Sequence, residues 1–147
     1  MPHLVYLDTS ALVKRYVEEE GSLEVRSLFE EGALLSTSAL TRVEMAAALR
    51  KAARIGALTT EEAQQALQAF EEDWPGFYRI RPTDLLLKTA AELAWKESLR
   101  GYDATHLASA LLLKELLSVE VTFAAFDRQL AIAAQRQGLR PFPTGSG

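Results

Sequence analysis

Short apolar segments alternate with longer helical patterns along the whole chain of 147 residues. Such alternation is typical of an α/β fold, in which helices cover both faces of a parallel sheet. Five strands are expected, over residues 3–7, 33–37, 77–80, 119–126 and 139–142. Pro141 would confine the last of them to an edge of the sheet. No linker, repeat or low-complexity tract divides the sequence, so we expect one domain over residues 1–147.

Glycines and capping residues mark the ends of the expected helices. Thr59 is followed three residues later by Glu62, which forms a capping box, and Asp103 and Asp127 are N-cap candidates. Helices are expected over about 10–18, 22–31, 38–55, 59–73, 83–99, 103–117 and 127–138.

The amino-acid composition limits where in the cell the chain is expected and which chemistry it can perform. The chain has no cysteine, which excludes disulfides, thiolate metal sites and a cysteine nucleophile. The first residues lack the basic start and long apolar run of a signal peptide, and no apolar stretch approaches about 18 residues. We therefore expect a soluble, cytoplasmic protein that does not enter a membrane. Its net charge of −4 makes it a poor general binder of nucleic acid, unless metal ions neutralise some of its acids.

Four acids stand in apolar surroundings: Asp8, Glu44, Asp103 and Asp127. Ligands of parallel sheets bind beyond the carboxyl ends of the strands, where Asp8 and Asp127 are expected. Each of the three aspartates could instead simply cap a helix. Glu44 lies inside a helix on an apolar stripe, so it needs a partner, which could be Arg42, another base or a metal ion.

If the four acids converge, they repel one another, and a divalent cation would relieve the repulsion. Mg²⁺ prefers oxygen ligands and bridges to substrate phosphates. A site of this kind can activate water and stabilise the leaving oxygen of a phosphodiester.

Other polar and aromatic residues give weaker signals. Four bases lie close in sequence to a candidate acid and could hold phosphates, or could be solvated or ion-paired: Lys14, Arg15, Arg42 and Arg128. His106 and Ser109 lack a third member, so nucleophilic catalysis is not expected of them. His3 is expected at the edge of a strand. Trp74 and Trp95 are expected in the core or in a dimer contact.

Four fragments in order give the chain a family resemblance. They are LDTSALVK at 7–14, Glu44, GYDATHLASA at 101–110 and FDRQL at 126–130. With these fragments the chain resembles the PIN-domain ribonucleases, and most closely the VapC toxins of toxin–antitoxin pairs. The resemblance extends over nearly the whole length. Many members of the family carry Thr or Ser two residues before the last acid, whereas this chain has Ala125.

The resemblance implies a three-layer fold with a five-stranded parallel sheet, and cleavage of RNA that depends on Mg²⁺ or Mn²⁺. The metal would be held by Asp8, Glu44, Asp103 and Asp127. Ser10 matches a hydroxyl that supports such sites, and Thr9 beside it, Arg42 and Arg128 are further candidates for supporting the site or contacting phosphate. The resemblance also implies a homodimer and a small VapB-like antitoxin that often places a basic side chain at the acids.

The leading hypothesis is a metal-dependent endoribonuclease that acts as a VapC-like toxin and leaves a 5′-phosphate and a 3′-hydroxyl. A housekeeping RNA-processing nuclease would use the same chemistry. An inactive PIN-fold module that binds RNA or protein is a third reading, although such a module has no reason to keep four mutually repelling acids. A metal-dependent phosphatase is a distant fourth, because the turn after Asp8 lacks the second aspartate of the aspartyl-phosphate signature.

Overall fold

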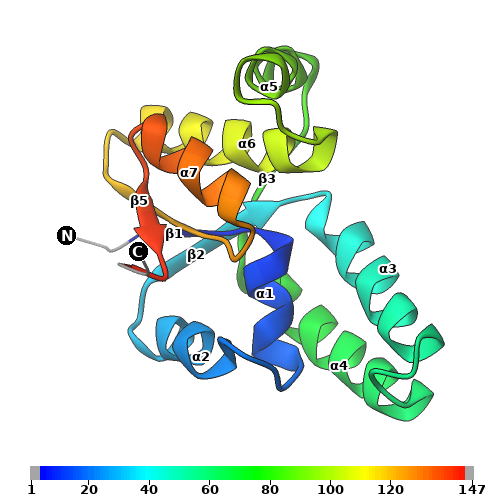
Figure 1. Cartoon of the computed structure of the whole chain (residues 1–147). Coiled ribbons are helices and arrows are strands. Elements are labelled where there is room, and N and C mark those ends of the chain that lie inside the picture. The colour runs from blue at the N-terminus through cyan, green and yellow to red at the C-terminus, as the bar shows by residue number, and fades with distance from the viewer. Residues whose placement is uncertain (1–3, 145–147) are drawn as a thin grey trace.

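Five parallel strands form one sheet in the computed structural model, which describes residues 4–144 (Figure 1). The order across the sheet is β3-β2-β1-β4-β5, with β1 in the centre. The elements are β1 (Leu4–Leu7), α1 (Thr9–Tyr16), α2 (Ser22–Glu30), β2 (Leu34–Ser38), α3 (Thr41–Arg54), α4 (Thr60–Asp73), the 3₁₀ helix η1 (Trp74–Gly76), β3 (Tyr78–Ile80), α5 (Asp84–Glu97), α6 (Gly101–Leu117), β4 (Val121–Ala124), α7 (Arg128–Arg136) and β5 (Arg140–Phe142). The expected five-stranded α/β architecture is confirmed.

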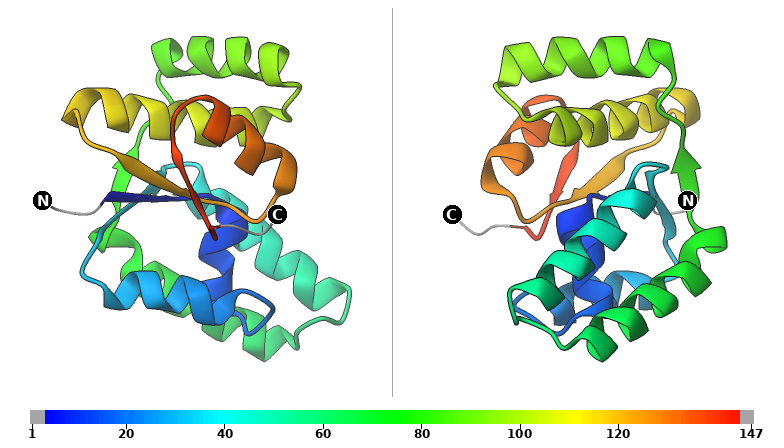
Figure 2. Two further views of the ribbon diagram at one scale, coloured as in Figure 1. Left: turned by 60° about the vertical axis from the view of Figure 1, so that its left-hand side comes forward. Right: turned by 90° about the vertical axis from the view of Figure 1, so that its right-hand side faces the viewer.

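The side chains of β1 alternate between two hydrophobic layers, as the two-residue period of a strand requires. Leu4 and Tyr6 belong to a layer built with residues of α5, α6 and α7. Val5 and Leu7 belong to the opposite layer, with residues of α1, α2, α3 and α4. Figures 1 and 2 show these groups of helices on the two sides of the sheet, with α5 packed outside α6. All four residues of β1 are buried, so the core encloses the central strand on both faces.

Local side-chain chemistry fixes the helix starts. At α4, Thr59 accepts from the backbone N–H of Glu62, and Glu62 accepts from the N–H of Thr59, so the predicted capping box is confirmed. Asp127 caps α7 by accepting from the N–H of Leu130. Between α1 and α2 the chain turns at Gly21 with φ +92°, where an added Cβ would lie 2.7 Å from the Phe126 ring. The left-handed backbone and this close approach both require glycine there.

Polar residues form β2 despite their weak strand signal. Ser36, Thr37 and Ser38 are buried, and two of their hydroxyls donate to the backbone of β1: Ser36 to the carbonyl of Val5 and Thr37 to the carbonyl of Leu7. Ser38 accepts from the N–H of Leu40, and α3 begins only at Thr41. The strand therefore runs one residue further than expected and the helix starts later, because the hydroxyls find partners inside the sheet.

Other expectations differ from the structure in detail. The strand expected over 119–126 is shorter, as β4. Trp74 is buried as expected, whereas Trp95 is 90% exposed and so is not part of the core. His3 lies outside the described residues. Within residues 4–144, no helix is long and apolar enough to cross a membrane.

Candidate active site

The carboxyl ends of β1 and β4 lie side by side at the centre of the sheet, and one of the predicted acids stands at each. Asp8 follows β1 directly, and Asp127 stands three residues beyond the end of β4. From β1 the chain builds outward to β3 and then returns to place β4 on the other side of β1. This reversal is the place where ligands bind in open parallel sheets. The other two acids come from the helices α3 and α6.

Asp8 is buried at this edge, with a side chain that does not cap α1. Only 3% of the residue is exposed, and it makes no side-chain capping bond although it occupies the N-cap position. Its Oδ2 accepts instead from the Ser10 hydroxyl at 2.6 Å, and Ser10 Oγ in turn accepts from the N–H of Phe126 at 3.1 Å. The interpretation of Asp8 as a simple helix cap is therefore wrong. The end of β1 is tied to the loop that leads to Asp127.

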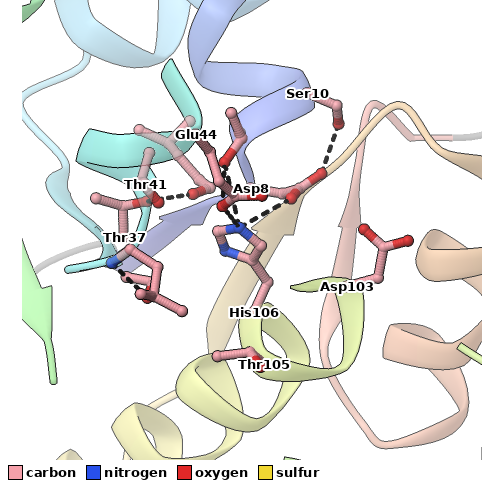
Figure 3. A network of polar contacts seen from close by, with 12 residues as sticks. Asp8, Ser10, Thr37, Thr41, Glu44, Asp103, Thr105 and His106 are labelled. Carbon is pink, nitrogen blue, oxygen red and sulfur yellow. Dashed lines mark hydrogen bonds and ion pairs between the residues drawn. The ribbon is translucent and has the colours of Figure 1, made fainter. Parts of the chain in front are cut away.

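Glu44 finds its partner in His106, which is 1% exposed on α6. His106 Nε2 lies 2.7 Å from Glu44 Oε1 (Figure 3). The Thr9 hydroxyl donates to the same oxygen at 2.9 Å. The partner suggested by the sequence, Arg42, does not pair with Glu44. Arg42 forms a bidentate ion pair with Glu71 of α4, because Arg42 lies on the outer side of α3.

Burial and neighbouring charges shift the ionisation of the buried groups. Burial raises the pKa of Asp8 above its ordinary value, the charge of His106 and the Ser10 hydroxyl oppose this, and the charges of Asp103 and Glu44 add to it. For Glu44, burial favours a higher pKa, but the hydrogen bond and charge of His106 outweigh it and the pKa is lowered. Burial would lower the pKa of His106, yet its carboxylate neighbours raise it above the ordinary value. The three groups thus influence one another electrostatically, as Figure 3 shows in their close placement.

Asp103 and Asp127 share a different cation. Arg100 donates to Asp103 Oδ2 at 3.1 Å and to Asp127 Oδ2 at 3.3 Å. Asp103 was an N-cap candidate, but α6 begins two residues earlier at Gly101, so Asp103 lies in the first turn and Arg100 takes the N-cap position. Asp127 does cap its helix, so the capping interpretation holds for this acid. His106 Nε2 also lies 3.5 Å from Asp8 Oδ1. The structure thus divides the acids into two pairs: His106 joins Asp8 and Glu44, and Arg100 joins Asp103 and Asp127.

The donor set matches a hard divalent cation, because all four acids offer carboxylate oxygens. Asp8 lies close enough to Glu44 and Asp103 for both charges to raise its pKa. Within the described residues, no three acidic or imidazole side chains stand around a single point as a ready metal cage. Asp103 and Asp127 hold the guanidinium of Arg100, so a metal at these acids would compete with that guanidinium.

Of the remaining bases predicted near the acids, Lys14 and Arg15 contact other groups and Arg128 is exposed. Lys14 bonds Glu19 and the carbonyl of Glu20, and it also lies 4.6 Å from the Phe126 ring centre. Arg15 stacks over Phe29. Arg128 is exposed at the first position of α7.

Sequence reasoning missed both Arg100 and His106 as partners of the acids. The available signal was helical spacing: each stands three residues from Asp103, and residues three apart lie on the same face of a helix.

Comparison with known proteins identifies the family. The PIN domain family matches residues 5–135. The chain belongs to the PIN domain family. Among its relatives, Ribonuclease VapC45 of Mycobacterium tuberculosis is 36% identical over 140 residues, which are 95% of each chain. Ribonuclease VapC3 of Pyrobaculum aerophilum is 35% identical over 106 residues, covering 71% of this chain and 79% of the relative.

A solved PIN-fold neighbour supports the architecture. FitAcB from Neisseria gonorrhoeae superposes with a TM-score of 0.66 at 16% identity, and covers 95% of this chain and 96% of its own. At this identity the likeness concerns the fold alone. It agrees with the observed parallel sheet and its helical layers.

Proposed function

We propose that this PIN-domain protein is a VapC-type endoribonuclease that depends on Mg²⁺ or Mn²⁺. One observation carries the proposal: Asp8 lies close enough to Glu44 and Asp103 for both charges to raise its pKa, and Arg100 pairs with both Asp103 and Asp127. Asp8 is buried and the other three acids are partly buried, so their mutual repulsion is costly, and binding a cation relieves the cost. Relatives named Ribonuclease VapC, 36% identical over 95% of this chain, support RNA as the substrate.

Each residue has a part in this proposal. The four acids would hold the metal, which supplies an activated water and charge neutralisation at the scissile phosphate. Ser10 fixes Asp8, and Thr9 fixes Glu44, each through one hydroxyl. Arg100, whose side chain is 79% exposed, is free to leave the acids and contact phosphate when metal replaces it.

An antitoxin partner follows from the same electrostatics. The acids outnumber the bases at the site, and Arg100 already shows that a guanidinium fits between Asp103 and Asp127. We propose that a small VapB-like antitoxin inhibits the enzyme by placing a basic side chain at these acids. A housekeeping nuclease would have no such partner.

A homodimer is the fourth part of the proposal. Large apolar side chains are exposed on two helices: Val43 on α3, with 67% of the residue exposed, and Leu85 and Trp95 on α5, at 74% and 90%. The helices α3 and α5 belong to opposite layers, so Val43 is not part of one surface with Leu85 and Trp95. A contiguous exposed apolar patch is typical of a surface that a partner covers, and α5 is the candidate for such a surface. We propose a second copy of the chain as that partner.

The deciding experiment is an RNA cleavage assay on purified protein. Structured and unstructured RNA are incubated with Mn²⁺, and then with chelator, beside an Asp8→Asn variant. We expect cleavage by the wild type with metal, 5′-phosphate and 3′-hydroxyl ends, and no cleavage with chelator or by the variant. Cleavage that continues unchanged in chelator would exclude the metal mechanism. Adding the co-expressed product of a neighbouring small gene tests the antitoxin, which should abolish cleavage.

A further inference from the structure

His106 is a buried imidazole with both ring nitrogens engaged. Its Nδ1 lies 2.8 Å from the Tyr6 hydroxyl, and its Nε2 lies 2.7 Å from Glu44 Oε1. Tyr6 is itself fully buried in the central strand, and its ring stacks on Phe123 of β4 at 5.5 Å. The buried hydroxyl of the central strand therefore fixes the Nδ1 side of the imidazole.

On its other side His106 faces the acids. Besides Glu44, Nε2 lies 3.2 Å from Thr9 Oγ1 and 3.5 Å from Asp8 Oδ1. When the Tyr6 hydroxyl donates to Nδ1, the proton of the neutral imidazole must be on Nε2, where it points at Glu44. Thr9 then completes a triangle by donating to the same carboxylate oxygen at 2.9 Å.

We propose that His106 is a positioning residue for the acids of the proposed nuclease, and that the Tyr6–His106–Glu44 chain holds Glu44 ready for the metal. The inference rests on the proposed function. Two bonds engage Oε1, and among the described residues no hydrogen bond is formed to Oε2, so Oε2 is the oxygen that can reach a cation. A carboxylate held in this way loses less rotational freedom on binding metal than a free one does.

If His106 had only a structural role, the side chain at this position would need only to fill its space in the core. Tyr6 and Phe123 already fill the apolar layer, so an apolar side chain of similar size would satisfy packing at position 106. A residue that competes with the metal for Glu44 would also sit here, but its removal would tighten metal binding. Metal affinity therefore separates the three roles.

The experiment measures Mn²⁺ binding by calorimetry on the full chain, with RNA kinetics beside it. The test variants are His106→Phe, His106→Gln and Tyr6→Phe. Gln keeps a donor near the Nε2 position, whereas Phe keeps only the volume. Ser22→Ala is the control, since Ser22 is buried and makes two hydrogen bonds, to Val17 and Glu19, that involve none of the acids.

We expect His106→Phe to weaken Mn²⁺ binding about 10- to 100-fold, and His106→Gln to stay within about threefold of the wild type. Tyr6→Phe removes one hydrogen bond and should weaken binding about two- to tenfold, which decides the question if His106→Phe does not fold. In kinetics at limiting metal, kcat should fall while KM for RNA changes by less than about twofold, because a residue 1% exposed cannot touch RNA. Ser22→Ala should bind Mn²⁺ like the wild type.

Three results would overturn the proposal: Mn²⁺ binding by folded His106→Phe equal to the wild type, tighter binding by that variant, or an equal loss in Ser22→Ala. Failure of the nuclease proposal looks different. If the wild type binds Mn²⁺ and His106→Phe loses it, while neither cleaves RNA, the positioning role stands and the ribonuclease assignment falls. If the wild type cleaves RNA and His106→Phe binds metal normally, the ribonuclease assignment stands and the positioning role falls.

Discussion

The hydroxyl of Ser10 donates to Asp8 Oδ2 at 2.6 Å, the shortest hydrogen bond that any of the four candidate acids accepts from a described residue. Ser10 Oγ also accepts from the N–H of Phe126, so one side chain joins the end of β1 to the loop after β4. The carboxylate of Asp8 is thereby fixed at the point where the strand order of the sheet reverses.

Replacing Ser10 with alanine tests this link. Ser10→Ala removes the donor to buried Asp8 and leaves the Phe126 N–H without its acceptor, so we expect a loss of about 1–3 kcal/mol in the free energy of unfolding. Urea denaturation measures it. Ser27→Ala is the matched control, because its hydroxyl bonds only the Glu24 carbonyl on an exposed helix face. Equal stability of the two variants would contradict the proposed role of Ser10.

The Asp103→Asn variant tests whether Asp103 is a metal ligand or only a residue in the first turn of α6. The substitution removes a charge that repels Asp8 and gives up an ion pair with Arg100, whose side chain is 79% exposed. In chelator we therefore expect stability within about 1 kcal/mol of the wild type. RNA cleavage should fall at least about 100-fold, since a charged oxygen ligand is lost. Thermal unfolding and a cleavage assay measure the two effects, and near-full cleavage by this variant would remove Asp103 from the proposed site.

Two variants of Asp127 distinguish helix capping from metal binding. Asp127→Asn keeps an acceptor for the Leu130 N–H and should unfold within about 0.5 kcal/mol of the wild type, whereas Asp127→Ala loses the cap and should cost about 1 kcal/mol. If Asp127 is a metal ligand, its negative charge is required, so both variants should lose RNA cleavage. Activity retained in Asp127→Asn but reduced in Asp127→Ala would show that the residue acts only as a cap.

Adding metal should stabilise the wild type by linkage. At a Mn²⁺ concentration 100 times its dissociation constant, binding contributes about 2.7 kcal/mol. For a chain of this size that raises Tm by about 5–10 °C. Differential scanning calorimetry with Mn²⁺ and with chelator measures the shift. Asp8→Asn should lose most of it, and an unchanged shift in that variant would place metal binding elsewhere on the protein.

The proposed dimer can be followed through Trp95. The other tryptophan, Trp74, is buried and 6% exposed, so only Trp95 can report a newly covered surface. If a second copy covers α5, Trp emission should shift to longer wavelength as the protein is diluted from tens of micromolar. Trp95→Phe should abolish this shift. Light scattering that gives a monomer at tens of micromolar would exclude the dimer.

Local patterns determined the secondary structure. The capping box at Thr59 and Glu62, the cap at Asp127 and the apolar runs of β1 and β4 depend on near neighbours, so the sequence predicted them with errors of a few residues. The errors occur where tertiary contacts act. Ser38 extends a strand rather than opening a helix because its neighbours Ser36 and Thr37 bond the backbone of β1.

The four acids could also be selected from the sequence, because each stands in apolar company where an unpaired charge is costly. Their partners could not. Glu44 and His106 are 62 positions apart, and Arg100 and Asp127 are 27 positions apart. Only the packing of α3, α6 and α7 around the sheet brings them within hydrogen-bonding distance. Sequence determines which side chains carry charge and which segments form helices and strands, whereas the fold decides which charges meet, because electrostatic pairing depends on distance in space.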